Sequence, residues 1–205
     1  MIRSVALLAL LSAAPLPAIA QDEFDPATVT EIDAIECRLG VPTYNGFAGD
    51  IDEVASHRRW RKVKTGNPFL LEYELPAAIA VAGDYRTRRV AFTASGIVAI
   101  LDLADPAVVA RTEGIENAMD PSPFLDAAAA SGQFPRAEID AQVQFRKFLG
   151  ERVVSEITEP ATEPGGYGVH ATVSRSIFNV TTHPGKTLYG CSYTIELLDD
   201  AGKPL

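Results

Sequence analysis

The stretch YGVHATVSRSIFNVTTHPGKTLYGCSYTIELL, residues 167–198, decides the fold. It contains two long runs in which β-branched and aromatic residues alternate with polar ones, a pattern typical of strands with one buried face. Between the runs, His183-Pro184-Gly185-Lys186 places proline and glycine at their preferred positions in a type II turn. The stretch therefore predicts an antiparallel hairpin with Cys191 facing the interior. A tight turn at Pro184-Gly185 would set Cys191 opposite Phe178.

Strand patterns also precede this hairpin. In FLLEYEL, residues 69–75, apolar residues alternate with Glu72 and Glu74, which predicts a strand with one solvent-exposed face. RRVAFTA and IVAILDL flank Ser95-Gly96, as expected for a second hairpin. Residues 141–158 fit one or two strands or a short helix, and we favour strand.

Three segments begin with a capping residue followed by proline and end in glycine. They are residues 25–40, 105–114 and 122–132, which open at Asp25-Pro26, Asp105-Pro106 and Ser122-Pro123. A capping side chain, a proline in the first turn and a terminal glycine together predict a helix. Strands with helices grouped between them indicate an α+β fold. We expect an antiparallel β-sheet of about six to eight strands with two or three short helices.

The first twenty residues resemble a secretory leader. Arg3 precedes an apolar run, and Ala18-Ile19-Ala20 supplies the small residues that signal peptidase requires before Gln21. The alternative is an uncleaved N-terminal anchor, but the apolar run is shorter than the roughly 20 residues that span a bilayer. The leader is short and alanine-rich, as in bacteria. We therefore expect a signal peptide at 1–20, a single α+β domain at 21–205, and a periplasmic or secreted protein without a stable membrane anchor after cleavage.

Export gives the two cysteines a role. Cys37 and Cys191 remain after cleavage, and an even number of cysteines in an oxidising compartment indicates a disulfide. The bridge would tie the start of the domain to its end, which stabilises the fold by on the order of 4–5 kcal/mol in the chain-entropy model. Two separate free thiols are the alternative.

Charge is unevenly distributed along the mature chain. Its 17 bases and 27 acids give a balance of −10, which opposes binding to nucleic acids and anionic membranes. Residues 21–56 carry nine acids against Arg38 alone, whereas residues 57–89 carry eight bases against three acids. The first segment therefore sums to −8 and the second to +5.

The stretch HRRWRKVK, residues 57–64, is the most basic part of the chain. One interpretation is internal: the basic edge of a sheet lies beside the acidic N-terminal helix and resists edge-to-edge aggregation. The other is an anion site, in which arginines grip phosphate or carboxylate and Trp60 serves as an anchor. The residues of this candidate site are Arg58, Arg59, Trp60, Arg61, Arg86 and Arg88.

The sequence contains no complete catalytic, nucleotide-binding or metal-binding motif. The chain has no G-x-S-x-G, no P-loop and no dinucleotide-binding glycine pattern. His170 and His183 are too far apart along the predicted hairpin to share a metal, and His57 lies among arginines that would oppose a cation. We expect no catalytic residue, metal or cofactor. The sequence favours a non-catalytic binding or structural module of the cell envelope, whose partner is an anionic ligand or an envelope protein. The alternative is an envelope hydrolase whose site forms only in the tertiary structure.

Overall fold

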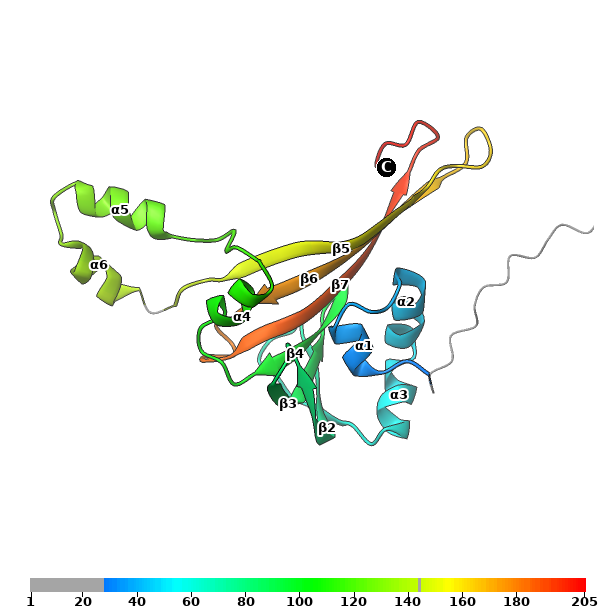
Figure 1. Cartoon of the computed structure of the whole chain (residues 1–205), viewed down its shortest axis with the longest axis horizontal. Coiled ribbons are helices and arrows are strands. Elements are labelled where there is room, and N and C mark those ends of the chain that lie inside the picture. Colours follow the sequence, from blue (N-terminus) through cyan, green and yellow to red (C-terminus); the bar gives the residue numbers. More distant parts are fainter. Residues whose placement is uncertain (1–27, 144) are drawn as a thin grey trace, which may run out of the picture.

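The computed structural model describes residues 28–143 and 145–205, so the leader and the expected helix start at Asp25-Pro26 lie outside the described residues. Its centre is one antiparallel sheet in the order β1-β2-β3-β4-β7-β6-β5 (Figure 1). The strands are β1 (Arg61–Val63), β2 (Leu71–Val81), β3 (Tyr85–Phe92), β4 (Gly96–Leu101), β5 (Leu149–Glu159), β6 (Gly168–Phe178) and β7 (Thr187–Leu198). The α+β fold with an antiparallel sheet is confirmed.

Three helices cover one face of the sheet (Figure 1). They are α1 (Glu31–Ile35), α2 (Val41–Gly49) and α3 (Ile51–His57). Thr30 caps α1 through a capping box with Asp33, and the helix ends before Cys37, whose φ is +57°. The helix expected over residues 25–40 is therefore shorter than predicted. Gly40 precedes α2 as its N-cap and does not terminate a longer helix.

The disulfide between Cys37 and Cys191 fixes this helical layer to the sheet. It joins the residues after α1 to the middle of β7, with the two Cα atoms 5.3 Å apart. Beside it, the ring of Tyr44 in α2 stacks on that of Tyr193 in β7, with 4.0 Å between the centroids. The predicted disulfide and the inward direction of Cys191 are both confirmed, since Cys191 is buried.

The hairpin of β6 and β7 forms in a different register from the one predicted. The turn does contain His183-Pro184-Gly185-Lys186, and Gly185 has the positive φ that the turn requires. The strands, however, stop at Phe178 and resume at Thr187, so the connection is longer than a tight turn. Phe178 lies opposite Leu188, and Cys191 lies opposite Arg175 and not opposite Phe178.

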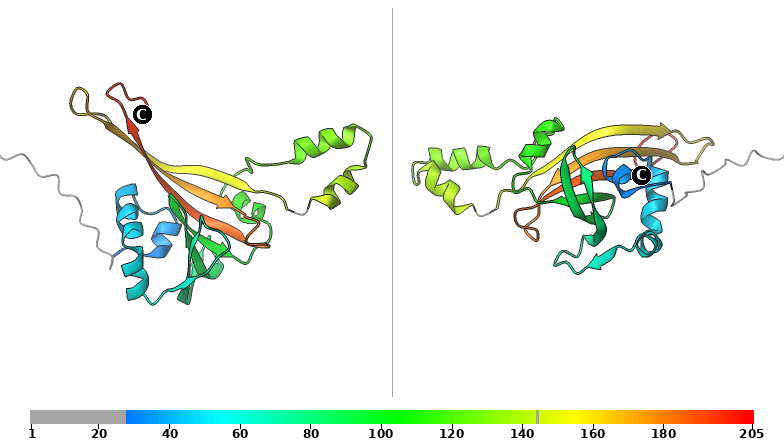
Figure 2. Two further views of the ribbon diagram at one scale, coloured as in Figure 1. Left: turned by 180° about the vertical axis from the view of Figure 1, so that it is seen from behind. Right: turned by 60° about the horizontal axis from the view of Figure 1, so that its bottom comes forward.

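A helical arm leaves the sheet between β4 and β5. Helix α4 (Ala107–Thr112) lies close to the sheet, while α5 (Ser122–Ala130) and α6 (Arg136–Gln142) project from it and pack on each other (Figure 2). Helices α4 and α5 occupy the two predicted segments, but α6 was not expected. Arg136 joins the projecting pair by ion pairs with Asp126 and Asp140.

A second arm is formed by the sheet itself. The distal parts of β5, β6 and β7, residues 153–172 and 194–205, extend beyond the helices that cover the core (Figure 1). We call this part the β-arm. Ten of the eleven residues of β5 are exposed. In the described part of the chain, no helix is long and apolar enough to cross a membrane.

Candidate functional site

The residues of the expected anion site do not gather in one cavity. Arg58 turns to the acidic helix, where Nη1 lies 2.8 Å from Glu31 Oε2, and Trp60 is buried beside Tyr73. Arg61 and Arg88 both form ion pairs with Glu74. These contacts fit internal complementarity between a basic edge and its acidic neighbours.

The other two cations of that set face solvent. Arg59 is exposed and adopts a left-handed backbone with φ +58°, and Arg86 is exposed on β3. The two cavities described below are lined by none of the six residues. Anion binding by this stretch remains a prediction.

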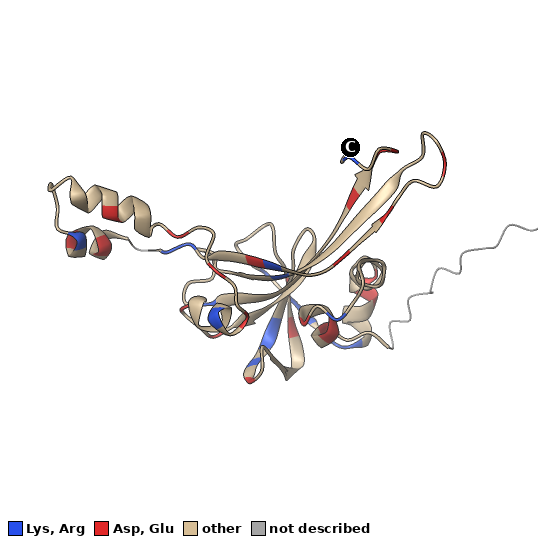
Figure 3. Cartoon of the chain, turned by 45° about the horizontal axis from the view of Figure 1, so that its top comes forward, with Lys and Arg blue, Asp and Glu red and all other residues tan. Residues whose placement is uncertain are grey.

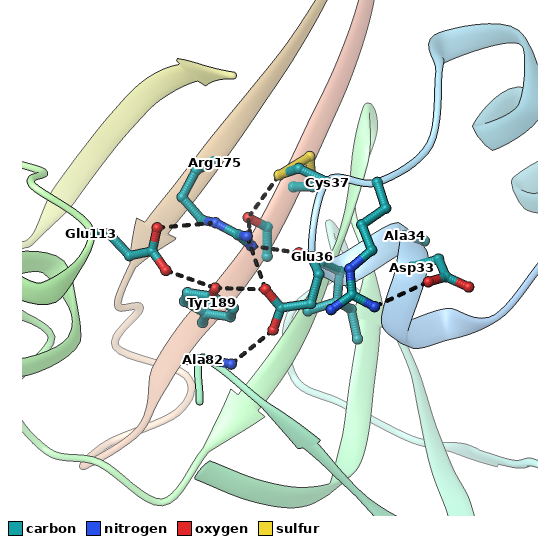
Figure 4. Close-up of polar contacts among 12 residues, drawn as sticks. Asp33, Ala34, Glu36, Cys37, Ala82, Glu113, Arg175 and Tyr189 are labelled. Carbon is teal, nitrogen blue, oxygen red and sulfur yellow. Dashed lines mark hydrogen bonds and ion pairs between the residues drawn. A yellow bond between two sulfur atoms is a disulfide. The ribbon is translucent and has the colours of Figure 1, made fainter. Parts of the chain in front are cut away.

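A buried polar network adjoins the disulfide (Figure 4). Arg175 of β6 is only 5% exposed and donates from Nη2 to Glu36 Oε2 at 3.0 Å and from Nη1 to the carbonyl of Ile35 at 2.5 Å. Its guanidinium carbon also lies 4.3 Å from the centre of the Tyr189 ring, which is a cation–π geometry. Arg175 thus ties α1 to the middle of the sheet.

Tyr189 links this arginine to a second carboxylate. Its hydroxyl lies 3.0 Å from Glu36 Oε2 and 3.0 Å from Glu113 Oε1, so its single proton can serve only one of them at a time. Burial raises the pKa of Tyr189 far above its usual value, which keeps the hydroxyl a neutral donor. Glu36 also accepts the backbone N–H of Ala82 at 2.8 Å.

The network therefore joins separated parts of the chain. Glu36 follows α1, Ala82 follows β2 and Glu113 follows α4, and all three meet at the side chains of β6 and β7 (Figure 4). Because its members bond to one another and line none of the named cavities, its chemistry is that of a structural clamp.

A second polar cluster lies on the opposite face of the sheet. Glu72 of β2 is fully buried, and its carboxylate contacts Arg89 of β3 and Nε2 of His183, the latter at 2.8 Å. Burial alone would raise the pKa of Glu72, but hydrogen bonds from Arg89 and Thr65 and the nearby charges hold it below its usual value. The expected solvent-exposed face of β2 is therefore wrong at Glu72, because the β6–β7 connection covers it.

The cavity beside His183 is lined by several acidic and basic residues. It has a volume of about 500 Å³ and lies between the start of α4, the start of α5 and the β6–β7 connection. Its charged lining residues are Asp105, Asp120, Arg146, Lys147, His183 and Lys186. Burial lowers the pKa of Lys147, whose Nζ donates to the carbonyl of Asn179 at 2.6 Å.

His183 and its carboxylate partner resemble part of a general-base arrangement. Both ring nitrogens are engaged, however: Nε2 by Glu72 and Nδ1 by the Thr182 hydroxyl at 3.1 Å. Among the residues that the structure describes, no group of three histidine, cysteine or acidic side chains could hold a metal ion.

The largest cavity carries no charge. It has a volume of about 730 Å³ and lies between α2, the β1–β2 connection and the β3–β4 turn. Its lining includes the aromatic residues Tyr44, Phe69, Phe92 and Tyr193, and it ends at Ile195 on the β-arm. The cavity therefore continues into an apolar part of the surface.

Sequence reasoning missed both polar clusters. Arg175 did give a signal, because strand alternation sets it on the same inward face as the apolar Val173 and Ile177. The pairing of Glu72 with His183 gave none, since it depends on how the β6–β7 connection folds over β2.

In comparisons with known proteins, no family model, curated protein or solved structure matches the chain.

Proposed function

We propose that this chain is a non-catalytic binding module of the cell envelope, exported to the periplasm or beyond, that works by associating with a partner protein. One observation carries the proposal: large apolar side chains are exposed mainly on the two projecting parts. These residues are Met119, Phe124 and Phe134 around the helical arm and Val153, Val154, Ile157, Tyr167, Ile195 and Leu197 on the β-arm. Exposed apolar patches are typical of interaction sites.

The chemistry of the core supports the same proposal. Arg175 and Glu72, its most buried charged groups, are bonded to partners within the chain and do not face a cavity as free groups. An envelope protein is favoured over an anionic ligand, because Arg58, Arg61 and Arg88 of the basic stretch are paired internally. The disulfide is consistent with an oxidising compartment.

The test removes apolar side chains from the β-arm only. The triple variant Ile157→Thr, Ile195→Thr, Leu197→Thr keeps β-branched or polar residues suited to strands, so we expect its melting temperature to stay within a few degrees of wild type. Chemical cross-linking in the native host, followed by purification, should recover a partner with the wild-type chain and lose it with the variant.

The matched control is Phe69→Ser, which removes an apolar side chain that is 83% exposed but lies outside both arms. This variant should keep the partner. Retention of the partner by the triple variant, or its equal loss with Phe69→Ser, would contradict the proposal.

A second candidate is an envelope hydrolase, and the observation that favours it is His183 in the 500 Å³ cavity, hydrogen-bonded to a buried carboxylate. Its test is turnover of simple ester, amide and phosphomonoester substrates by wild type and His183→Gln. Hydrolysis that disappears in this variant would establish the hydrolase, whereas the binding module predicts no turnover by either protein.

A further inference from the structure

The outer edge of β5 is the longest open edge of the described sheet. The opposite edge strand, β1, has three residues, whereas β5 has eleven. Residues 151–159 are all exposed, and no described residue outside β6 hydrogen-bonds to their backbone. An exposed strand edge presents unpaired N–H and C=O groups that accept another strand.

At two places near the β-arm, the chain covers a strand edge with its own segments. At the start of β5, Leu149 directs its N–H to Asn117 Oδ1 at 2.9 Å and its C=O to the N–H of Ala118 at 2.9 Å. At the far end of β7, the C-terminal tail turns back, and the N–H of Leu205 bonds to the carbonyl of Leu197. On β5, the stretch beyond the cover at Leu149 is left open.

The direction of the open backbone groups follows from Leu149. Because successive residues of an antiparallel strand alternate in direction, Glu151 and Val153 also point their N–H and C=O groups outward. The register then shifts by one residue between Val153 and Ser155. Beyond this bulge the outward-pointing residues are Glu156 and Thr158.

The two faces of the β-arm differ in chemistry. On the face that continues from the core, Ile157, Ala171 and Ile195 lie side by side on three strands. On the other face, the corresponding row is Thr158, His170 and Glu196. A strand added beside β5 would therefore meet an apolar row on one face and a polar row on the other.

The β-arm is also strongly acidic. Its six acids, against Lys203 alone, give a balance of −5 with His170 neutral. They are Glu156, Glu159, Glu163, Glu196, Asp199 and Asp200, and they belong to no ion pair of the described chain (Figure 3). A second copy pairing β5 with β5 would bring like charges together, which is destabilising.

We infer that the edge Glu151–Glu159 binds an extended segment of a partner protein in which apolar side chains alternate with lysine or arginine. This inference rests on the proposed function and specifies its surface and its partner. The added strand would pair with the outward backbone groups of Glu156 and Thr158, place its apolar side chains beside Ile157 and set its cations beside the arm's carboxylates.

The experiment uses a blocked peptide of about nine residues in which valine and lysine alternate, titrated into the full mature chain. We expect chemical-shift changes and new amide protection at Glu156 and Thr158, and weaker binding at high salt because exposed charges are screened. A peptide with glutamate in place of lysine is the charge control and should not bind.

Two variants at one position separate backbone from charge. Glu156→Gln removes one exposed charge, which corresponds to about a 1.4- to 5-fold loss of affinity. Glu156→Pro also removes an outward N–H, which the β5–β6 ladder does not use, and should weaken binding more than tenfold. Protection of the Ala171 and Val173 amides checks that β5 still pairs with β6.

A second probe needs no change in the protein. N-methylation of the peptide on alternate residues blocks one of its hydrogen-bonding edges, and one of the two alternate patterns should abolish binding. Equal binding by both patterns, or by wild type and Glu156→Pro, would overturn the inference. Association of the mature chain with itself that is lost in Glu156→Pro would also overturn it, in favour of a second copy.

These outcomes are separable from those of the proposed function. A partner that depends on the apolar side chains of the β-arm, together with no binding of the lysine–valine peptide, would refute the strand-addition site and leave the binding module. If no partner depends on the apolar side chains of the β-arm and the peptide does not bind, both the binding module and the strand-addition site are refuted.

Discussion

At the scale of single residues, the buried charges determine what this fold can tolerate. Arg175 lies inside the molecule, where it forms ion pairs with Glu36 and, at a longer distance, with Glu113. Removing one partner of a buried ion pair costs more than the pair contributes, because the other charge stays desolvated. The Arg175 cluster should therefore be sensitive to single substitutions.

Arg175→Met should lower the free energy of unfolding by about 3–5 kcal/mol, because it removes the buried cation that compensates the partly buried Glu36 carboxylate. Arg152→Met is the control, since Arg152 contacts the same Glu113 but its side chain is 46% exposed. That change should cost about 0–1 kcal/mol. Urea unfolding of both variants measures the difference, and equal costs would contradict the assignment of Arg175 as the clamp.

Glu72 makes the stability of the fold depend on acid pH. Its pKa is lower in the folded protein than the usual value of about 4.3, so its contribution is present above that value and is lost as pH falls. Glu72→Gln should be less stable than wild type at pH 7 by about 1–3 kcal/mol, since Arg89 and His183 lose a charged acceptor. The difference should shrink as the pH falls below the usual carboxyl pKa of about 4.3. Parallel stability curves for the two proteins would be inconsistent with this linkage.

The residues of the candidate sites show where sequence reasoning stops. Cys37 and Cys191 were predicted to pair because their compartment and number sufficed. Glu72 was predicted to be exposed but is buried, since strand alternation says which residues share a face but not what covers it. The covering residue, His183, is over one hundred positions away in the sequence.

At the scale of elements, local signals predicted those helices that carry their own start and stop residues. Helices α4 and α5 lie where Pro106, Pro123 and the following glycines indicated. Helices α2 and α3 were both missed; in α2, Pro42, Gly46 and Gly49 are unfavourable for a helix. Packing overrides that local preference: Phe47 and Val54 are buried in the main core.

The contact between β4 and β7 depends on a glycine. A Cβ built on Gly190 would lie 2.0 Å from the carbonyl oxygen of Ile97 and 2.6 Å from Cα of Val98. Both atoms belong to the backbone of β4, so no side-chain rotation could relieve the clash. The close approach of these two strands therefore excludes any side chain at this position.

Gly190→Ala should thus destabilise the fold by at least about 2 kcal/mol, because the added Cβ would clash with the backbone of β4. Gly49→Ala is a suitable control, because a Cβ there meets nothing within 4 Å. It should be neutral or slightly stabilising, since alanine is preferred to glycine in a helix. Thermal unfolding distinguishes them; a neutral Gly190→Ala would mean that β4 and β7 lie farther apart than the structure has them.

At the scale of the whole molecule, the chain combines a clamped centre with two exposed projections. The disulfide, the Tyr44–Tyr193 stack and the Arg175 network all join the N-terminal helices to β6 and β7. The helical arm and the β-arm lie outside these contacts (Figure 2). The centre therefore holds the sheet in place while the arms remain accessible to a partner.

The disulfide should contribute more to stability than any other single link, because it is covalent and closes a very long loop. Cys37 and Cys191 are separated by 154 residues, for which the chain-entropy model gives on the order of 5 kcal/mol. At about 2–4 °C per kcal/mol for a chain of this size, reduction should lower the melting temperature by roughly 10–20 °C. The double variant Cys37→Ser, Cys191→Ser should have the same melting temperature as the wild-type chain with its disulfide reduced, and reductant should not change it. If the wild-type chain melted identically in both conditions, the helical layer would be held by the buried polar network and aromatic packing alone, and Arg175→Met should then separate it from the sheet.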